Sequence, residues 1–336
     1  MKKTVQIPLV SRRRFLALAP LSLGLSWVAN GFPAGGKDKP NSKFGGVQIG
    51  VITYSYRTMP GDLHQLIQYC VDSNVSAIEL MGDPAEEFLG KPEPPFPTTP
   101  LGPGRRRPPL TEEQKTQLSA YNKQVAEWRL TLDVTKFREV RRVFADAGIS
   151  IYAFKPIVFG VNNSDAEVEY GIRAAKELGA KSVTVELPTD PAQSLRLGKL
   201  GEKHKVYIGY HNHLQATDTL WDNALSQSPY NSINFDCGHY LAAGGANTRE
   251  SLMSFLEDKH ERITSMHLKD RTTPANGQKN LVWGSGDTPI REILLQIKKR
   301  KYNFPVTVEL EYEIPEGSNA VKEVARCVEY AKKILI

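Results

Sequence analysis

Eight apolar, strand-like runs alternate with amphipathic helical segments along most of the chain. The runs are rich in β-branched residues and mostly lack a polar face, as expected for parallel strands covered on both sides. They are expected at residues 47–55, 77–80, 149–154, 182–187, 206–211, 232–236, 263–268 and 306–310. Helices are expected at 62–73, 132–147, 165–178, 192–204, 220–226, 249–262, 289–300 and 319–335. This alternation predicts an α/β fold of the (β/α)8, or TIM barrel, class.

One long segment, residues 83–131, interrupts the alternation after the second expected strand. It is too long for a simple connection between a strand and a helix. Residues 85–109 are dense in proline, whereas residues 110–130 have the pattern of a helix. Because this insertion follows a strand, we expect it near the mouth of the barrel. Two interpretations stay open: a lid that contributes to substrate selectivity, or a contact surface in a homo-oligomer.

The N-terminal 30 residues have the layout of an export signal. They contain five basic residues and no acidic one, and an apolar run follows Ser11-Arg-Arg-Arg-Phe-Leu16. The arginines before Phe-Leu resemble a twin-arginine signal, and the apolar run is short for a membrane span. We therefore expect a signal at 1–30, a flexible mature N-terminus at 31–45 and the barrel at 46–336. The mature protein is expected in the periplasm or otherwise exported, without a stable membrane anchor.

Charge and cysteine content exclude several classes of protein. The formal net charge is +6, and removing the five charges of the signal leaves +1. A nearly neutral body gives no electrostatic basis for binding nucleic acid. The cysteines Cys70, Cys237 and Cys327 are odd in number and widely spaced, which argues against a disulfide framework.

Carboxylates and imidazoles stand at the ends of five successive expected strands. They are Glu186, His211, Asp236, His267 and Glu309. In a parallel barrel these ends converge on one mouth, where catalytic groups gather. A set of carboxylates and imidazoles suits Mn, Zn, Fe or Mg better than a thiolate site does. The sequence therefore predicts a divalent metal site at the mouth of the barrel.

Further polar residues near the strand ends are expected to bind the substrate. Alternation along the strand places Lys269 and Arg271 on the same face as His267. Both are candidates to hold substrate oxygens, although a surface ion pair explains Arg271 equally well. Lys155 ends the third strand, where it either binds a substrate oxygen or reaches solvent.

His239 follows Asp236 by three residues. Because Cys237 and Gly238 permit a sharp turn, we expect His239 to point back toward the pocket. The alternative is a hydrogen bond from His239 to a neighbouring loop. A glycine-rich loop at 283–289 lacks the phosphate-binding pattern, and Asp287 or Thr288 is expected to cap the next helix.

Four short motifs resemble those of the sugar phosphate isomerase/epimerase superfamily, also described as the xylose isomerase-like barrel. They are Tyr210-His-Asn-His213, Asp236-Cys-Gly-His239, His267-Leu-Lys-Asp270 and Glu309-Leu-Glu311. The resemblance covers roughly residues 45–336. The superfamily includes ketose 3-epimerases, inosose dehydratases and the endonuclease IV branch, so the motifs are not specific for one reaction.

The resemblance implies one divalent ion, often Mn, held by Glu, Asp, His and Glu from four strands. Asp236, His267 and Glu309 match this pattern directly. The first Glu has no direct match: either His211 replaces it, or Glu186 supplies the carboxylate from one strand earlier. We take Glu186 as the fourth expected ligand, with Zn, Fe, Co and Mg as alternative ions.

Together these features predict a sugar isomerase or epimerase that removes a proton α to a carbonyl through a metal-stabilised enediolate. Glu309 or Glu186 is expected to abstract the proton, and His211 or His213 to return it. By resemblance, His239 contacts the sugar. The alternatives are a metal-dependent lyase or dehydratase acting on keto-sugars or keto-glycosides, and a non-catalytic sugar-binding barrel. A phosphodiesterase of the endonuclease IV kind is disfavoured by the nearly neutral body and by export.

Overall fold

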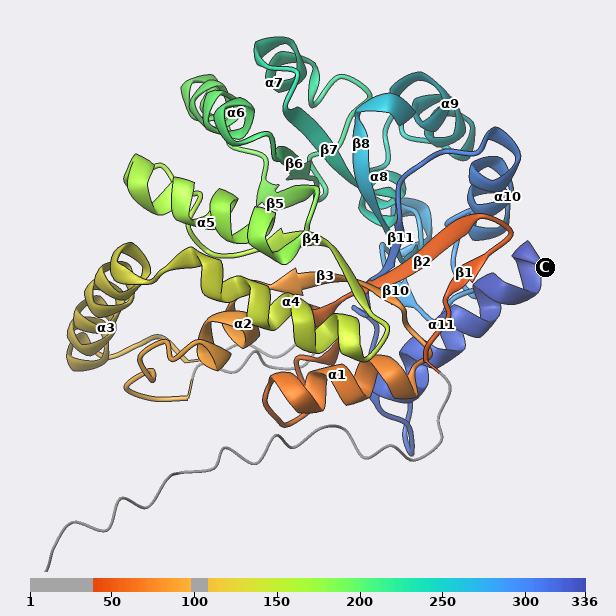
Figure 1. Cartoon of the computed structure of the whole chain (residues 1–336). Helices are drawn as coiled ribbons and strands as arrows, with labels where there is room; N and C mark the ends of the chain where they lie inside the picture. Colours follow the sequence, from red (N-terminus) through yellow and green to blue (C-terminus); the bar gives the residue numbers. More distant parts are fainter. Residues whose placement is uncertain (1–38, 98–107) are drawn as a thin grey trace, which may run out of the picture. The chain divides into compact units, whose positions relative to one another are not determined.

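The computed structural model describes residues 39–97 and 108–336, so the expected export signal lies outside the described residues. Eight parallel strands form a closed barrel, because β2 pairs with both β3 and β11 (Figure 1). The strands are β2 (Val47–Ile52), β3 (Ala77–Met81), β4 (Ser150–Lys155), β5 (Ser182–Glu186), β6 (Tyr207–His211), β7 (Asn231–Asp236), β8 (Ile263–Leu268) and β11 (Val306–Val308). The prediction of a TIM barrel is therefore confirmed.

Helices connect successive strands, close to the positions that the sequence predicts. They are α1 (Leu63–Asp72), α4 (Phe137–Asp146), α5 (Asp165–Leu178), α6 (Pro191–His204), α7 (Asp222–Gln227), α9 (Arg249–Lys259), α10 (Ile290–Arg300) and α11 (Ala320–Leu335). Local sequence fixes many of their ends. In α5, Ser164 and Glu167 form a capping box, and Gly179 ends the helix in the left-handed conformation, with φ of 79°.

The strands β2 and β11 are shorter than expected, because hydrogen bonds of a side chain replace the backbone hydrogen bonds between them beyond Ile52 and Val308. After Ile52, the chain turns into a 3-10 helix, η1 (Thr53–Tyr56). Ser55 Oγ donates a hydrogen bond to Val308 O at 3.3 Å and accepts one from Leu310 N at 3.1 Å. Both strands therefore end below the mouth, and Glu309 follows the last residue of β11.

Several short elements were not expected from the sequence. A helix, α8 (Cys237–Ala243), directly follows β7. Strand β1 (Lys43–Phe44) pairs antiparallel with β2, and β9 (Asp270–Arg271) pairs antiparallel with β10 (Asn280–Leu281). A 3-10 turn, η4 (Pro274–Asn276), was not expected either. The turns η2 (Val134–Lys136) and η3 (His260–Arg262) lie within the helices expected at 132–147 and 249–262.

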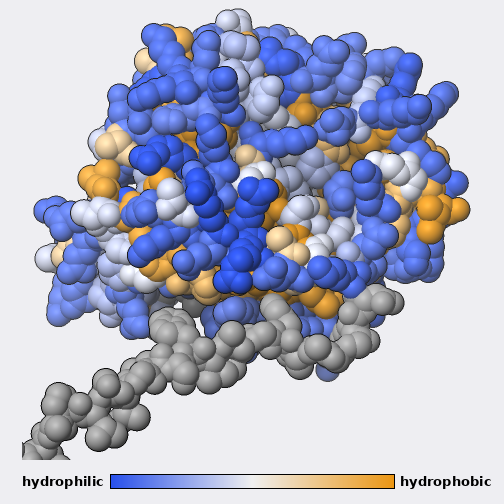
Figure 2. Space-filling model, in the orientation of Figure 1, coloured by the Kyte–Doolittle hydropathy of each residue, from blue (hydrophilic) through white to orange (hydrophobic). Residues whose placement is uncertain are grey.

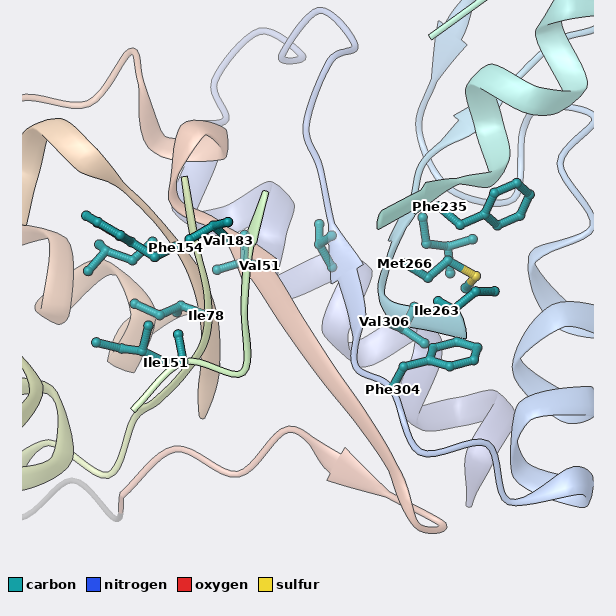
Figure 3. Close-up of a cluster of buried hydrophobic side chains, with 14 of the residues drawn as sticks. Val51, Ile78, Ile151, Phe154, Val183, Phe235, Ile263, Met266, Phe304 and Val306 are labelled. Atoms are coloured by element: carbon teal, nitrogen blue, oxygen red, sulfur yellow. The ribbon is translucent and has the colours of Figure 1, made fainter. Parts of the chain in front are cut away.

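Apolar side chains form the layer between the strands and the helices. Figure 3 shows part of this layer, with Val51, Ile78 and Ile151 from neighbouring strands and Phe235 and Met266 from β7 and β8. All five are buried, and each such side chain stabilises the fold by roughly 1.5–3 kcal/mol. This layer holds the strands in register and so fixes the positions of their polar ends.

The interior of the barrel is polar in its upper part, next to the mouth. The buried Asn234 amide donates hydrogen bonds to Ser265 Oγ at 2.7 Å, Glu79 Oε2 at 3.1 Å and Thr184 Oγ1 at 3.4 Å. Tyr152 OH lies 2.8 Å from Thr307 Oγ1. Buried polar groups of this kind persist only when they are hydrogen-bonded, so the network forms a rigid floor beneath the strand ends.

The insertion after β3 contributes two helices, α2 (Gly82–Phe88) and α3 (Glu112–Thr131), with residues 98–107 outside the described residues. Figure 1 shows α3 outside the ring of barrel helices, on the side of α2 and α5. Arg129 of α3 makes a bidentate ion pair with the buried Glu86 of α2, with both N–O distances 2.8 Å. Tyr170 of α5 also donates a hydrogen bond to Glu86, at 3.2 Å. The insertion is thus fastened to the barrel.

The face seen in Figure 2 is mostly hydrophilic, with small separate apolar areas. Within the described ranges, no helix is both long and apolar enough to cross a membrane. Cys70, Cys237 and Cys327 are free and buried, in agreement with the expectation that they form no disulfide framework.

Candidate metal centre at the barrel mouth

Four side chains converge at the ends of four neighbouring strands. His211 ends β6, Asp236 ends β7, His267 lies near the end of β8, and Glu309 follows β11. One donor atom from each lies within 4.8 Å of the other three, and all four side chains are buried. In the strand register, Asp236 lies opposite His267, and His211 lies opposite Asn234, two residues before Asp236 on the same face of β7.

The ring of His211 is oriented by the floor of the barrel. Its Nδ1 lies 2.7 Å from Asn234 Oδ1, while the amide nitrogen of Asn234 donates to other groups. The amide oxygen must therefore accept a hydrogen bond from Nδ1–H, which leaves Nε2 with a free lone pair directed at the cluster. Burial, helped by the nearby charges of His267 and Lys155, holds the pKa of His211 well below its usual value.

His267 is held between two carboxylates. Its Nε2 lies 2.9 Å from Glu79 Oε2, and its Nδ1 lies 2.9 Å from Glu309 Oε2. Burial lowers the pKa of His267, but the two carboxylates outweigh that effect and raise it to about 10. Glu79 can keep the proton on Nε2 and leave Nδ1 for a cation, the carboxylate–histidine pairing common in metal sites.

The charges of the cluster favour a divalent cation. Glu79, Asp236 and Glu309 are three buried carboxylates, whereas Lys269 is the nearest buried ammonium, 2.9 Å from Asp236 Oδ2 and 2.7 Å from Glu309 Oε2. The raised pKa keeps His267 protonated without an ion, so His267 and Lys269 together offset two of the three negative charges and one remains at low dielectric. A divalent ion would take the place of the proton on His267 Nδ1, and two negative charges would then be left for it to balance. Among the described residues, the contact of Asp236 Oδ2 with Lys269 lacks hydrogen-bond geometry, which leaves this buried oxygen a candidate ligand. The donor set and the charge both fit a divalent ion.

Glu186 lies beside this cluster and outside the group of four. Its Oε1 accepts a hydrogen bond from Lys155 Nζ at 2.9 Å, and its Oε2 lies 2.9 Å from His213 Nε2. Burial raises the pKa of Glu186, but the contacts with His213 and Lys155 outweigh it and hold the pKa well below the usual value. The hydrogen bond to Glu186 raises the pKa of His213. This half-exposed carboxylate–imidazole pair suits proton transfer better than metal binding.

His239 enters the site because Asp236 starts a helix. The Oδ1 atom of Asp236 accepts a hydrogen bond from His239 N at 2.7 Å and caps α8. A side chain at Gly238 would come within 2.4 Å of Lys269 Cγ, so only glycine allows this close packing. The expected turn at Cys237 and Gly238 is therefore the first turn of a helix, and it carries His239 into the pocket.

His239 lies between two cations that can only donate hydrogen bonds. Arg271 Nη1 lies 2.6 Å from Nδ1, and Lys269 Nζ lies 3.0 Å from Nε2. Burial, with the charges of Lys269 and Arg271, lowers the pKa of His239 to about 3, so the ring is neutral near pH 7 and accepts at one nitrogen while the other carries a proton. The shorter contact, with Arg271, favours Nδ1 as the acceptor. The proton would then lie on Nε2, which is 3.3 Å from His213 Nδ1 and 3.6 Å from Glu311 Oε2.

The glycine-rich loop at 283–289 binds a carboxylate of the protein itself. Asp270 Oδ2 accepts hydrogen bonds from the backbone N–H groups of Gly284, Ser285 and Gly286, at 2.8–3.1 Å. Thr288 Oγ1 accepts a hydrogen bond from Arg271 N at 3.0 Å. The prediction that Asp287 or Thr288 caps the next helix is wrong. Both side chains form hydrogen bonds with residues of the 270–276 segment, and α10 starts after Pro289 without a side-chain cap. The loop braces the strand end that carries Lys269 and Arg271.

Sequence reasoning missed three residues of this site. Glu79 holds His267, Asn234 orients His211, and Glu311 Oε2 accepts a hydrogen bond from Lys269 Nζ at 2.7 Å. The sequence could have indicated Glu79, because a carboxylate within an apolar, fully buried strand needs a hydrogen-bonding or charged partner. Of the expected substrate groups, Lys269, His239 and Arg271 lie together, whereas Lys155 lies across the mouth beside Glu186.

Comparisons with known proteins agree with this architecture. Residues 115–331, more than half of the chain, match the family model of the xylose isomerase-like TIM barrel. A comparison of the sequence with curated proteins gives no significant match.

Three similar solved structures illustrate the relationship. One is a sugar phosphate isomerase/epimerase from Parabacteroides distasonis, with 16% identity and a TM-score of 0.56 over 87% of this chain and 96% of that chain. Another is the IolI protein with a bound zinc atom, with 16% identity and a TM-score of 0.57 over 86% and 99%. A third is the 3-keto-D-glucoside 4-epimerase YcjR from E. coli, with 11% identity and a TM-score of 0.54 over 85% and 99%. Together with the family match, this likeness of fold leads to one conclusion: the chain belongs to the family of xylose isomerase-like TIM barrels.

Proposed function

We propose that the protein is a divalent-metal-dependent sugar isomerase or epimerase that removes a proton from the carbon next to a ketone. The observation that carries this proposal is the cluster of His211, Asp236, His267 and Glu309, with the Glu186–His213 pair beside it. The rings of His211 and His213 are 4.9 Å apart. Metal-binding groups and proton-transfer groups would thus reach one sugar ring at the same time.

The metal would be held by His211 Nε2, Asp236, His267 and Glu309. When bound, a divalent cation would act as a Lewis acid and stabilise negative charge developing on the carbonyl oxygen of the substrate. Mn, Zn, Fe, Co and Mg all accept this nitrogen and oxygen donor set to some degree. We favour His211 over Glu186 as the fourth ligand, because Glu186 is engaged by Lys155 and His213.

Proton transfer is assigned to the Glu186–His213 pair. Glu186 would take the proton from carbon, and His213 Nε2 would hand a proton back. Lys155 keeps Glu186 ionised, since its ammonium lies 2.9 Å from the carboxylate. Return to carbon gives isomerisation or epimerisation, whereas loss of a β-substituent gives elimination, the alternative reaction at the same site.

His239 and Lys269 would position the sugar. His239 Nε2–H would donate to a hydroxyl or ring oxygen, and Lys269 would hold the two carboxylates Asp236 and Glu309 in place. Neither group needs to change its charge during the reaction. A neutral donor beside the metal also suits an uncharged sugar better than an anionic one.

Export is part of the proposal, since the segment expected to direct it, residues 1–30, lies outside the described residues. An exported enzyme would meet unphosphorylated sugars and keto-glycosides rather than phosphosugars. This location would distinguish the protein from relatives that act on sugar phosphates.

Solvent exchange tests the reaction. The purified protein, reloaded with Mn, is incubated in D₂O with a keto-hexose and a keto-glycoside, and deuterium incorporation next to the ketone is followed by NMR. We expect incorporation that His213→Gln slows by roughly 10²–10⁴-fold. The control His64→Gln changes a histidine on the surface of α1 and keeps full activity. Products identified in the same tubes separate epimerisation from elimination.

Absence of exchange with all ketones, from a protein that nonetheless binds them, would favour the non-catalytic sugar-binding barrel instead. Exchange unaffected by His213→Gln would contradict the assigned proton pair.

A further inference from the structure

A large cleft lies beside the metal centre, on the side of the mouth formed by β2, β3 and β4. Its volume is about 820 Å³, within the range of sites that enclose a drug-sized ligand and larger than a single sugar ring requires. Its walls come from η1, α2 and α3, so the insertion forms one side. The residues that matter most for its chemistry are Tyr54, Arg57, Lys91, Tyr121, Asn122 and Arg129.

The cleft and the metal centre share a wall. Arg57 Nη1 donates a hydrogen bond to Leu310 O at 2.8 Å, the residue after Glu309. Ile157 lines the cleft two residues after Lys155, which bonds Glu186. The chain segments that carry Glu309 and Lys155 therefore also border the cleft, so an extended ligand bound at both places would pass these segments.

The charges around the cleft do not favour a phosphate group. Lys91 forms ion pairs with Asp83 and, at 3.6 Å, with Glu86, and Arg129 pairs with the same Glu86. Arg57 stacks over the Tyr54 ring, 4.3 Å from its centroid, and bonds two carbonyl oxygens. The cations are thus already paired or engaged, and the acidic Glu87 and Glu167 also line the cleft. An anion would find no free cation among the described lining residues.

The same walls suit a neutral sugar ring. The ring of Tyr121 on α3 is partly exposed, and aromatic faces commonly pack against apolar faces of ligands. Asn122 is exposed next to it and makes no hydrogen bond to another described residue, which leaves its amide available to hydroxyl groups. Met59, Pro84 and Ile157 add apolar surface around these polar groups.

We infer that this cleft binds a second, uncharged sugar unit, so that the substrate is a keto-glycoside of at least two rings. This inference rests on the proposed function, because the keto ring must lie at the metal centre. The insertion would then act as a specificity element, with Tyr121 and Asn122 of α3 facing the second ring. Of the two interpretations of residues 83–131, this inference favours the one in which the insertion contributes to substrate selectivity.

The first test compares two substrates within each variant. Deuterium exchange is measured for a keto-disaccharide and for the methyl glycoside of the same keto-hexose, using the metal-loaded full chain. In the native protein, kcat/KM should favour the disaccharide by at least about tenfold, since binding energy from a remote ring supports the reaction. Tyr121→Ala should reduce that ratio by about three- to tenfold. The control Lys123→Ala, on the same helix but outside the cleft, should keep the native ratio.

A second test reads binding without catalysis. Calorimetry with cellobiose, methyl glucoside and inorganic phosphate should show that the disaccharide binds the native protein more tightly than either of the others. Tyr121→Ala should weaken disaccharide binding, and Asp236→Asn should leave most of it intact. Equal affinity for mono- and disaccharide, or preference for phosphate, would overturn the inference. Absence of exchange together with intact disaccharide binding would instead contradict the proposed function and leave the cleft assignment standing.

Discussion

His239 shows how one side chain decides the chemistry of another. The sequence places His239 near the mouth, but a histidine there can be a base, a ligand or a donor. The contact of Arg271 Nη1 with Nδ1, at 2.6 Å, favours a donor role for Nε2, whereas Lys269 Nζ, 3.0 Å from Nε2, competes as a donor to that nitrogen. Arg271 is accordingly a positioning residue.

The tautomer of His239 is a direct prediction of this contact. Nitrogen NMR of the histidine rings should find His239 neutral at pH 7, because its pKa lies near 3, with the proton on Nε2. In Arg271→Met, the Nδ1–H tautomer should appear, and KM for the sugar should rise by about tenfold for one lost hydrogen bond. A native protein with the proton on Nδ1 would contradict this account, whatever the variant does.

At the residue scale, the sequence predicts which residue types stand at the strand ends but not how they pair. Asp236, His267 and Glu309 could be assigned because strand ends of a barrel converge. The choice between Glu186 and His211 depends on which side chain Asn234 and Lys155 engage. These contacts join consecutive strands, 23 and 31 residues apart, and they depend on side-chain conformations that a strand pattern does not reveal. Glu79 was passed over because it lies within an apolar strand, where its partner His267 is 188 residues away.

At the scale of elements, one buried carboxylate, Glu86, links the two helices of the insertion to each other and to the barrel. Glu86 is fully buried on α2, and its two oxygens bind Arg129 of α3. Breaking such a pair leaves an uncompensated charge at low dielectric. The position of α3, and with it the wall of the cleft, depends on this contact.

Glu86→Gln should therefore destabilise the protein strongly. We expect a loss of ~3–5 kcal/mol in the free energy of unfolding, because the guanidinium of Arg129 loses its partner while buried. The measurement is urea denaturation followed by circular dichroism. The matched control Glu127→Gln changes an exposed carboxylate on α3 and should cost less than about 0.5 kcal/mol. Similar losses in both variants would show that the ion pair does not hold the insertion.

Regular elements were predictable because their signals are local. Capping residues such as Ser164 and apolar runs such as that of β8 act within a few residues of chain. Helix α8 was missed because its seven residues are too few for a periodic pattern, and its cap, Asp236, also reads as a metal ligand. The shortened β2 and β11 depend on Ser55, whose contact with Val308 spans the closure of the barrel.

At the scale of the whole molecule, the packing can be tested through the cysteines. Cys70, Cys237 and Cys327 are buried in the layers around the barrel. Burial raises the pKa of the Cys70 thiol to about 12 and that of Cys237 well above its usual value. All three thiols should thus remain protonated and inaccessible in the folded protein near pH 8.

A thiol reagent such as dithionitrobenzoate should detect none of the three cysteines at pH 8 and all of them in guanidinium chloride. Because a raised pKa keeps the thiol protonated, raising the pH to 9 should not expose them while the fold persists. Rapid reaction of any cysteine in the folded protein would show that the layer around the barrel is looser than described.

The central claim is that one divalent ion is held by His211, Asp236, His267 and Glu309. Elemental analysis of the purified chain by mass spectrometry tests it most directly, with Asp236→Asn, His267→Ala and Glu186→Gln measured beside it. The account predicts about one equivalent of a divalent metal in the native protein and in Glu186→Gln, and almost none in the other two variants. Metal that is absent even after reconstitution, or that is lost in Glu186→Gln but kept in Asp236→Asn, would contradict it.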